Sequence, residues 1–136
     1  MKAVFLDASA WFAAIDPHAQ HHAAAIARQN EAASGGVVFL TTHLVIAEVH
    51  AMVMSRRGPR AGQAFLRNAL GGAALHIVHP AAELIQAAAT EWVMRYGDQR
   101  FSLCDAVSFE VMRRERVRRV LTLDHHFATA GFEIVR

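Results

Sequence analysis

The chain has 136 residues, of which 54% are hydrophobic and 19% are charged. This length predicts a single domain over residues 1–136, and the apolar fraction excludes a disordered chain. Cys104 is the only cysteine, which excludes an internal disulfide and a cysteine-rich zinc site, so we expect it to be a buried filler. The formal charge of +2 comes almost entirely from arginine; it permits a nucleic-acid partner but does not predict one.

The apolar stretches predict neither a membrane span nor a secretory signal. The run before Asp7 contains only four apolar residues, and the long apolar stretch in the second half carries Glu83, Gln86 and Glu91. We therefore expect a cytoplasmic location and no membrane partner.

Short strands alternate with longer helices along the chain. Apolar, β-branched runs predict strands over residues 3–6, 36–40, 75–78, 120–123 and 132–135. Helical spacing and breakers predict helices over residues 10–15, 17–33, 43–54, 59–70, 80–96, 102–116 and 125–128, with Ser9 and Thr41 or Thr42 as N-caps and Pro17 opening the second helix. This alternation predicts an α/β fold, a three-layer α/β/α sandwich around a mostly parallel sheet of four to five strands.

Four carboxylates are expected to converge at one edge of that sheet. Asp7 and Asp124 each follow a predicted strand directly, and functional groups of open parallel sheets gather at the carboxyl ends of strands. Glu48 lies about one and a half turns into a helix that starts at the same edge, and Asp105 lies in the first turn of another.

Bringing these acids together is unfavourable without a cation. Two unit charges about 4 Å apart repel by roughly 4 kcal/mol at an effective dielectric near 20. Hard oxygen ligands suit Mg²⁺ or Mn²⁺, which activate water and stabilise charge on a phosphodiester oxygen. The pattern therefore predicts a metal site for phosphodiester hydrolysis.

Each acid also has a purely structural interpretation. Asp105 completes a capping box with Ser102, and Asp124 suits the N-cap of a short helix, so for both residues capping is about as good an explanation as catalysis. Glu48 sits among apolar helix residues, where a charge needs a partner, and Asp7 is the hardest of the four to explain by structure alone.

Four fragments of the sequence resemble the PIN-domain ribonucleases, and among them the VapC-type toxins of toxin–antitoxin pairs. In order along the chain, they are Val4-Phe-Leu-Asp7-Ala-Ser9-Ala-Trp11, Glu48 in its helix, Phe101-Ser-Leu-Cys-Asp105-Ala-Val-Ser108, and Leu121-Thr-Leu-Asp124-His-His-Phe127. The resemblance covers nearly the whole chain.

The resemblance implies an endoribonuclease that uses Mg²⁺ or Mn²⁺ and leaves a 5′-phosphate. It implies that Asp7, Glu48, Asp105 and Asp124 are the catalytic, metal-binding acids, supported by Ser9 and Thr122. It further implies a homodimer, an RNA substrate and a small VapB-like antitoxin that covers the active site. Some members carry an additional acid near Asp98, although an exposed loop aspartate is the expectation here.

Other polar and aromatic residues have simpler explanations. Five of the nine histidines in particular could suggest zinc, namely His18, His21, His22, His125 and His126. His18, His21 and His22 have no third ligand from another element and are expected at the surface, so we do not predict a zinc site. His125 or His126 could touch substrate, and the sequence does not choose between them.

Two arginine groups suit helix C-termini as well as RNA phosphates: Arg56, Arg57 and Arg60, and Arg113, Arg114, Arg116, Arg118 and Arg119. Core packing is the usual role of an aromatic pair such as Trp11 and Phe12, with a partly exposed docking patch as the alternative.

Two rival functions stay open. One is a non-catalytic metal-binding or RNA-binding regulatory module with the same fold, which the complete set of acids disfavours. The other is a receiver-like signalling domain, which needs a lysine after a late strand and an aspartate after a middle strand. Lys2 is the sole lysine, and no aspartate comes directly after the predicted strand that ends at Val78. The receiver is therefore the weakest alternative.

Overall fold

A computed structural model describes residues 2–72 and 75–136 of the protein. Its strands are β1 (Ala3–Leu6), β2 (Val38–Thr42), β3 (Leu75–Val78), β4 (Arg119–Leu121) and β5 (Glu133–Ile134). Its helical segments are α1 (Ala8–Ile15), α2 (His22–Ser34), α3 (His43–Arg57), α4 (Pro59–Gly71), α5 (Ala82–Ala88), η1 (Ala89–Met94), α6 (Leu103–Arg114) and α7 (His126–Thr129). None of the helices in the described ranges is long and apolar enough to cross a membrane.

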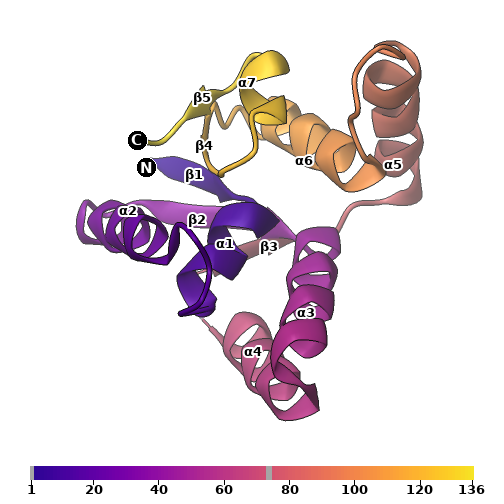
Figure 1. The fold of residues 1–136 in the computed structure, drawn as a ribbon. Coiled ribbons are helices and arrows are strands. Elements are labelled where there is room, and N and C mark those ends of the chain that lie inside the picture. Colours follow the sequence, from indigo (N-terminus) through magenta and orange to yellow (C-terminus); the bar gives the residue numbers. More distant parts are fainter. Residues whose placement is uncertain (1, 73–74) are drawn as a thin grey trace.

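The strands form one sheet in the order β3-β2-β1-β4-β5, and all four pairings are parallel. This confirms the predicted α/β sandwich. Right-handed crossovers put α1 to α4 on one face of the sheet, because the chain moves outward from β1 to β3. The return from β3 to β4 puts α5, η1 and α6 on the other face, as Figure 1 shows. The order therefore reverses between β1 and β4.

Aromatic rings fill the core between the sheet and α6. Phe109 is fully buried, and its ring packs edge to face on those of Phe101, Phe127 and Trp92 at centroid distances of 5.0, 4.9 and 5.1 Å. Burying a phenylalanine side chain contributes about 1.5–3 kcal/mol, and each aromatic pair about 0.5–1.5 kcal/mol more. This packing holds α6 and α7 against the carboxyl ends of the central strands.

The first two helices begin at residues other than those predicted. α1 starts at Ala8 with Asp7 as its N-cap residue, and Ser9 lies inside the helix instead of capping it. Residues 17–21 form turns, so Pro17 does not open α2, which starts at His22. The reason is local: the Asp16 carboxylate accepts the backbone N–H of His18 at 3.0 Å, and this turn holds the segment out of a helix.

The second strand lies two residues further along the chain than predicted. Gly36 has φ 77°, a left-handed conformation that suits the turn after α2, so the strand covers Val38–Thr42 instead of residues 36–40. Thr41 donates its hydroxyl hydrogen to the carbonyl of Leu6 at 3.0 Å. Thr42 ends the strand and caps α3 by accepting the N–H of Val45 at 3.2 Å, which identifies it as the cap among the two predicted threonines.

Differences in the second half of the chain are also local. The helix predicted over residues 80–96 divides into α5 and the π-helical segment η1. The strand predicted over residues 120–123 is Arg119–Leu121, and the last strand is only Glu133–Ile134. The predicted start of α6 is confirmed, because Ser102 caps the helix and forms the capping box with Asp105.

A buried carboxylate ties α6 to its neighbours. The Glu110 side chain is 1% exposed and accepts hydrogen bonds from Arg113 at 2.6 Å, Arg114 at 2.7 Å and the Trp92 indole at 3.2 Å. Arg114 continues to Glu83 on α5 at 2.8 Å. These bonds, that from Arg113 first, lower the pKa of Glu110 to about 2. Two of the arginines that could bind RNA therefore have structural partners.

We expect Glu110→Gln to lower the free energy of unfolding by about 1–2 kcal/mol at pH 7, because Arg113 and Arg114 lose a charged hydrogen-bond acceptor. The folded-state pKa lies below the unfolded value, so the advantage of the wild type is complete above pH 4.5 and shrinks as the pH falls toward 2. Urea denaturation at pH 7 and pH 3 measures both effects. Glu133→Gln, at an exposed pair 3.8 Å from Arg119, is the matched control, and an equal loss there would contradict the prediction.

Candidate active site

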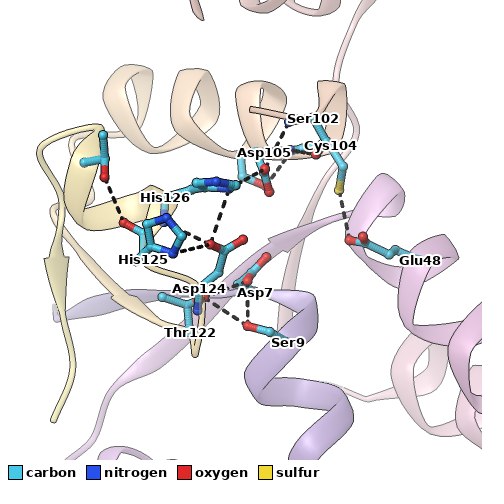
Figure 2. A network of polar contacts seen from close by, with 12 residues as sticks. Asp7, Ser9, Glu48, Ser102, Cys104, Asp105, Thr122, Asp124, His125 and His126 are labelled. Carbon is cyan, nitrogen blue, oxygen red and sulfur yellow. Dashed lines mark hydrogen bonds and ion pairs between the residues drawn. The ribbon is translucent and has the colours of Figure 1, made fainter. Parts of the chain in front are cut away.

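The four predicted acids come from four segments that meet where the strand order reverses. Asp7 follows β1, Asp124 follows β4, Asp105 lies in the first turn of α6 and Glu48 lies on α3. Figure 2 shows Asp7, Asp105 and Asp124 directed into one region, with Glu48 at its border. We call these four residues the acid site. They lie between the carboxyl ends of β1 and β4, which is where open parallel sheets bind ligands.

Asp7 is the most buried member of the acid site, with 5% of its surface exposed. Its Oδ2 accepts the hydroxyl hydrogens of Ser9 at 2.9 Å and of Thr122 at 2.7 Å. Burial disfavours the charged form and raises the pKa of Asp7 to about 6, with a contribution from the nearby charge of Asp105, although the two hydroxyl bonds act in the opposite direction. The carboxylate therefore ionises close to neutral pH unless a cation lies beside it.

Ser9 and Thr122 link three parts of the site, as their predicted supporting role requires. The Ser9 hydroxyl also accepts the N–H of Leu123 at 2.9 Å, and the Thr122 hydroxyl accepts the N–H of Asp124 at 2.9 Å. Each hydroxyl has a single hydrogen, and both hydrogens can be donated to Asp7. The pair thus fixes the Asp7 carboxylate against the loop after β4.

Asp124 lies three residues beyond the end of β4, and not directly after the strand as predicted. Thr122 and Leu123 leave the sheet because their polar groups bond to Asp7 and Ser9 instead of to a neighbouring strand. The Asp124 Oδ1 accepts the N–H of His126 at 2.9 Å, at the start of α7. The Asp124 carboxylate therefore contributes to the start of α7, although the N-cap residue of that helix is His125 and not Asp124 as the capping interpretation predicted.

Asp105 has the capping role that its sequence predicted, and its carboxylate lies beside Asp7. Its Oδ2 accepts the N–H of Ser102 at 3.1 Å, while its own N–H donates to the Ser102 hydroxyl at 3.0 Å. Its side chain is 14% exposed and lies close enough to Asp7 to affect the pKa of that residue. The N-terminus of α6 also provides a partial positive charge that favours a carboxylate in the first turn.

Glu48 and Cys104 form a contact that the sequence did not predict. Glu48 is exposed, and its Oε2 accepts the Cys104 thiol hydrogen at 3.4 Å. Cys104 is only partly buried, so it is not the buried filler that we expected. Burial and the neighbouring acids, Glu48 first among them, raise the pKa of the thiol well above its usual range, which keeps it protonated as a donor. No sequence pattern pairs residues this far apart.

The donor set of the acid site fits a hard divalent cation. All four side chains offer carboxylate oxygens, and burial of Asp7 beside Asp105 leaves negative charge that a cation would offset. Across the described ranges, no three of the four carboxylates have oxygen atoms within 4.8 Å of one another. Among the described residues, Asp124, His125 and His126 each offer one potential ligand atom, and these three atoms lie within 4.8 Å of one another.

The other predicted candidates lie outside this arrangement. His18 and His21 are exposed in the turn before α2, and His22 bonds through Nδ1 to the carbonyl of Ala13 at 2.7 Å. Within the described part of the chain, no metal-capable group contains them. Asp98 is exposed in the turn after η1 and makes no described contact with the acid site. These residues behave as the surface residues that the sequence predicted.

The aromatic pair and the first arginine group pack within the fold. Trp11 is 7% exposed and stacks edge to face on Phe65 at 5.1 Å, which argues against an exposed docking patch at this residue. Arg56 lies over the Phe12 ring at 5.8 Å, and Arg57 pairs with Asp16 at 3.4 Å.

The chain belongs to the PIN-domain family. The family model described as "PIN domain" matches residues 4–133, a range that contains all four members of the acid site.

Among similar proteins, the 23S rRNA-specific endonuclease VapC20 of Mycobacterium tuberculosis is 31% identical over 133 residues, covering 98% of both chains. Ribonuclease VapC26 of the same species is 36% identical over 126 residues, covering 92% of this chain and 90% of that one. The crystal structure of VapC20, described as a sarcin-ricin loop cleaving toxin, matches with a TM-score of 0.84 over 95% of both chains. VapBC2 from Rickettsia felis matches in fold alone, with a TM-score of 0.68 at 15% identity.

We expect Asp7→Asn to stabilise the protein at pH 7.5 in EDTA, because it removes a buried charge. The folded-state pKa of about 6 lies above the ordinary value of 3.8, so the wild type loses stability as the pH rises from about 4 to 6 and stays lower above that range. The shift corresponds to about 3 kcal/mol at most. Thermal unfolding should therefore show a higher midpoint for the variant at pH 7.5 and a much smaller difference at pH 4. A lower midpoint for Asp7→Asn at pH 7.5 would contradict this account.

We expect Thr122→Val to destabilise the protein by about 1–3 kcal/mol, because the Asp124 N–H loses its acceptor and Asp7 loses a donor inside the protein. Valine keeps the shape of the side chain. Thr129→Val is the matched control, since the Thr129 hydroxyl donates only to the His125 carbonyl in an exposed position. Chemical denaturation in EDTA measures both variants; equal, small effects would show that the Thr122 bonds do not organise the site.

Proposed function

We propose that the protein is a metal-dependent endoribonuclease that hydrolyses RNA phosphodiester bonds, and that residues 1–136 act as a single nuclease domain. The observation that carries the proposal is the convergence of Asp7, Asp105 and Asp124, with Glu48 beside them, at the carboxyl ends of β1 and β4. PIN-family membership and similarity to VapC20 and VapC26, both named as RNA-cleaving enzymes, support this chemistry.

In this proposal, the acid site holds Mg²⁺ or Mn²⁺ through its carboxylate oxygens. When bound, the cation supplies an acidified water and stabilises charge on the scissile phosphate. Ser9 and Thr122 orient the Asp7 carboxylate, and the capping box orients that of Asp105. Cys104 holds Glu48 at the border of the site by donating its thiol hydrogen. The chain's own contribution is thus a set of acids whose positions are fixed before any ligand arrives.

We propose RNA as the substrate and a cytoplasmic location. The name of VapC20 specifies 23S rRNA, which makes structured ribosomal RNA the first substrate to test. Arginines without a described acidic partner, among them Arg60 and Arg118, remain available to RNA phosphates.

We further propose that the protein is the toxin of a type II toxin–antitoxin pair, that it forms a homodimer and that a small VapB-like antitoxin inhibits it. The description of VapC20 as a toxin supports this role. The fold also offers an apolar groove of about 530 Å³, whose walls include Ile15, Val53 and Ala61, where an apolar segment of a partner could bind. An adjacent reading frame that encodes such a partner would support the proposal further.

We expect the purified chain to cut RNA with Mn²⁺ and not with EDTA, and we expect Asp105→Asn to lower the rate by about 100-fold or more. Asparagine keeps an oxygen that can accept the Ser102 N–H, so α6 retains its cap while the acid site loses one charge. Gel analysis of ribosomal RNA fragments, with circular dichroism to check folding, measures the effect.

Asp98→Asn is the matched control, because it removes the same charge from an exposed turn. It should cut RNA as the wild type does. Folded wild-type protein that binds Mn²⁺ but cuts no RNA would favour the non-catalytic regulatory module. Equal losses in the two variants would indicate that overall charge, and not the acid site, governs cleavage.

A further inference from the structure

The two histidines after Asp124 differ sharply in their surroundings. The His125 side chain is 83% exposed, whereas that of His126 is 18% exposed and is directed between Asp105 and Asp124 (Figure 2). The sequence gives no reason to separate these neighbours. α7 separates them, because its first residue is His126 and its next, Phe127, is fully buried in the core.

The His126 Nδ1 atom lies between two members of the acid site. It is 3.4 Å from Oδ2 of Asp105 and 3.3 Å from Oδ1 of Asp124. The atom is buried and forms no full hydrogen bond with any described residue. An N–H group that is directed between two acceptors lies at a similar distance from both and is aligned with neither. A buried polar atom without a partner is costly, so its position here calls for an explanation.

The ring is held in this orientation from two sides. Phe101, which precedes the capping box of α6, packs against it edge to face at 5.6 Å and 85°. The His126 backbone N–H donates to Oδ1 of Asp124 at 2.9 Å. The backbone bond fixes where the side chain leaves α7, and the ring cannot turn away from the acids without losing its contact with Phe101.

We propose that His126 is a positioning residue of the acid site, whose Nδ1–H lies between the carboxylates of Asp105 and Asp124 and sets the spacing at which they bind a divalent cation. This inference rests on the proposed metal-dependent function. The two acids come from different elements, α6 and the loop after β4, and no other described side chain bridges them. A donor between them reduces their repulsion and leaves Oδ1 of Asp105 and Oδ2 of Asp124 for the cation.

Two variants separate the donor from the ring. His126→Phe keeps a ring against Phe101 and removes the nitrogen. His126→Asn removes the ring but can place its amide nitrogen close to the position of Nδ1. His21→Phe is the matched control, because it makes the same change at an exposed residue before α2. Circular dichroism and thermal unfolding in EDTA establish that each variant folds.

The first measurement is Mn²⁺ affinity, from the electron paramagnetic resonance signal of free Mn²⁺ during titration. We expect His126→Phe to weaken binding by about tenfold or more, as loss of a hydrogen bond to a metal ligand does, and His126→Asn to restore most of it. His21→Phe should bind as the wild type. In RNA cleavage at saturating Mn²⁺, His126→Phe should recover most of its kcat with little change in KM.

Mn²⁺ affinity that is unchanged in His126→Phe would overturn the proposal. So would a loss that His126→Asn fails to restore, because the imidazole itself, as a ligand or as a packing group, would then be required. If the wild type binds Mn²⁺ in a His126-dependent way but cuts no RNA, the nuclease function fails while the positioning role stands. The two conclusions can therefore be tested separately.

Discussion

The structure around the acid site depends on how the Asp7 carboxylate is accommodated at the end of a buried strand. A carboxylate with 5% exposure needs hydrogen-bond donors, and Asp7 obtains two from hydroxyls on different connections, Ser9 in α1 and Thr122 after β4. The same hydroxyls accept the N–H groups of Leu123 and Asp124. One buried acid therefore ties the two central strands together at the point where the order of the sheet reverses.

This arrangement concentrates negative charge that the protein only partly offsets. The N-terminus of α6 favours the charge of Asp105, and His126 lies between Asp105 and Asp124. At Asp7, burial outweighs the hydrogen bonds that the carboxylate accepts and raises its pKa. By contrast, Glu110 on the same helix α6 is fully compensated by two arginines and has a lowered pKa. The comparison distinguishes a buried carboxylate whose charge is compensated by arginines from one whose charge is not.

The strands and the acid site were largely predictable, because their signals are local. An apolar run ending at Asp7 indicates a buried strand, and the boundaries of β1 and β3 were predicted correctly. The late start of α2 was missed because the Asp16 side chain competes with the helix that Pro17 would otherwise open. The contact of Cys104 with Glu48 and the choice between His125 and His126 were beyond prediction, since both depend on how separate elements pack.

From the sequence, capping and catalysis are alternative roles for Asp105 and Asp124. The geometry shows that the two roles are compatible. A carboxylate has two oxygens, and each of these residues bonds to the backbone through only one: Oδ2 of Asp105 caps α6, and Oδ1 of Asp124 begins α7. Asp7 likewise receives both hydroxyl hydrogens on Oδ2. The bonds that build the local structure orient each carboxylate without occupying its second oxygen. Under the proposed function, the bonds that build the local structure are therefore also those that orient the remaining oxygen of each of these aspartates toward a cation.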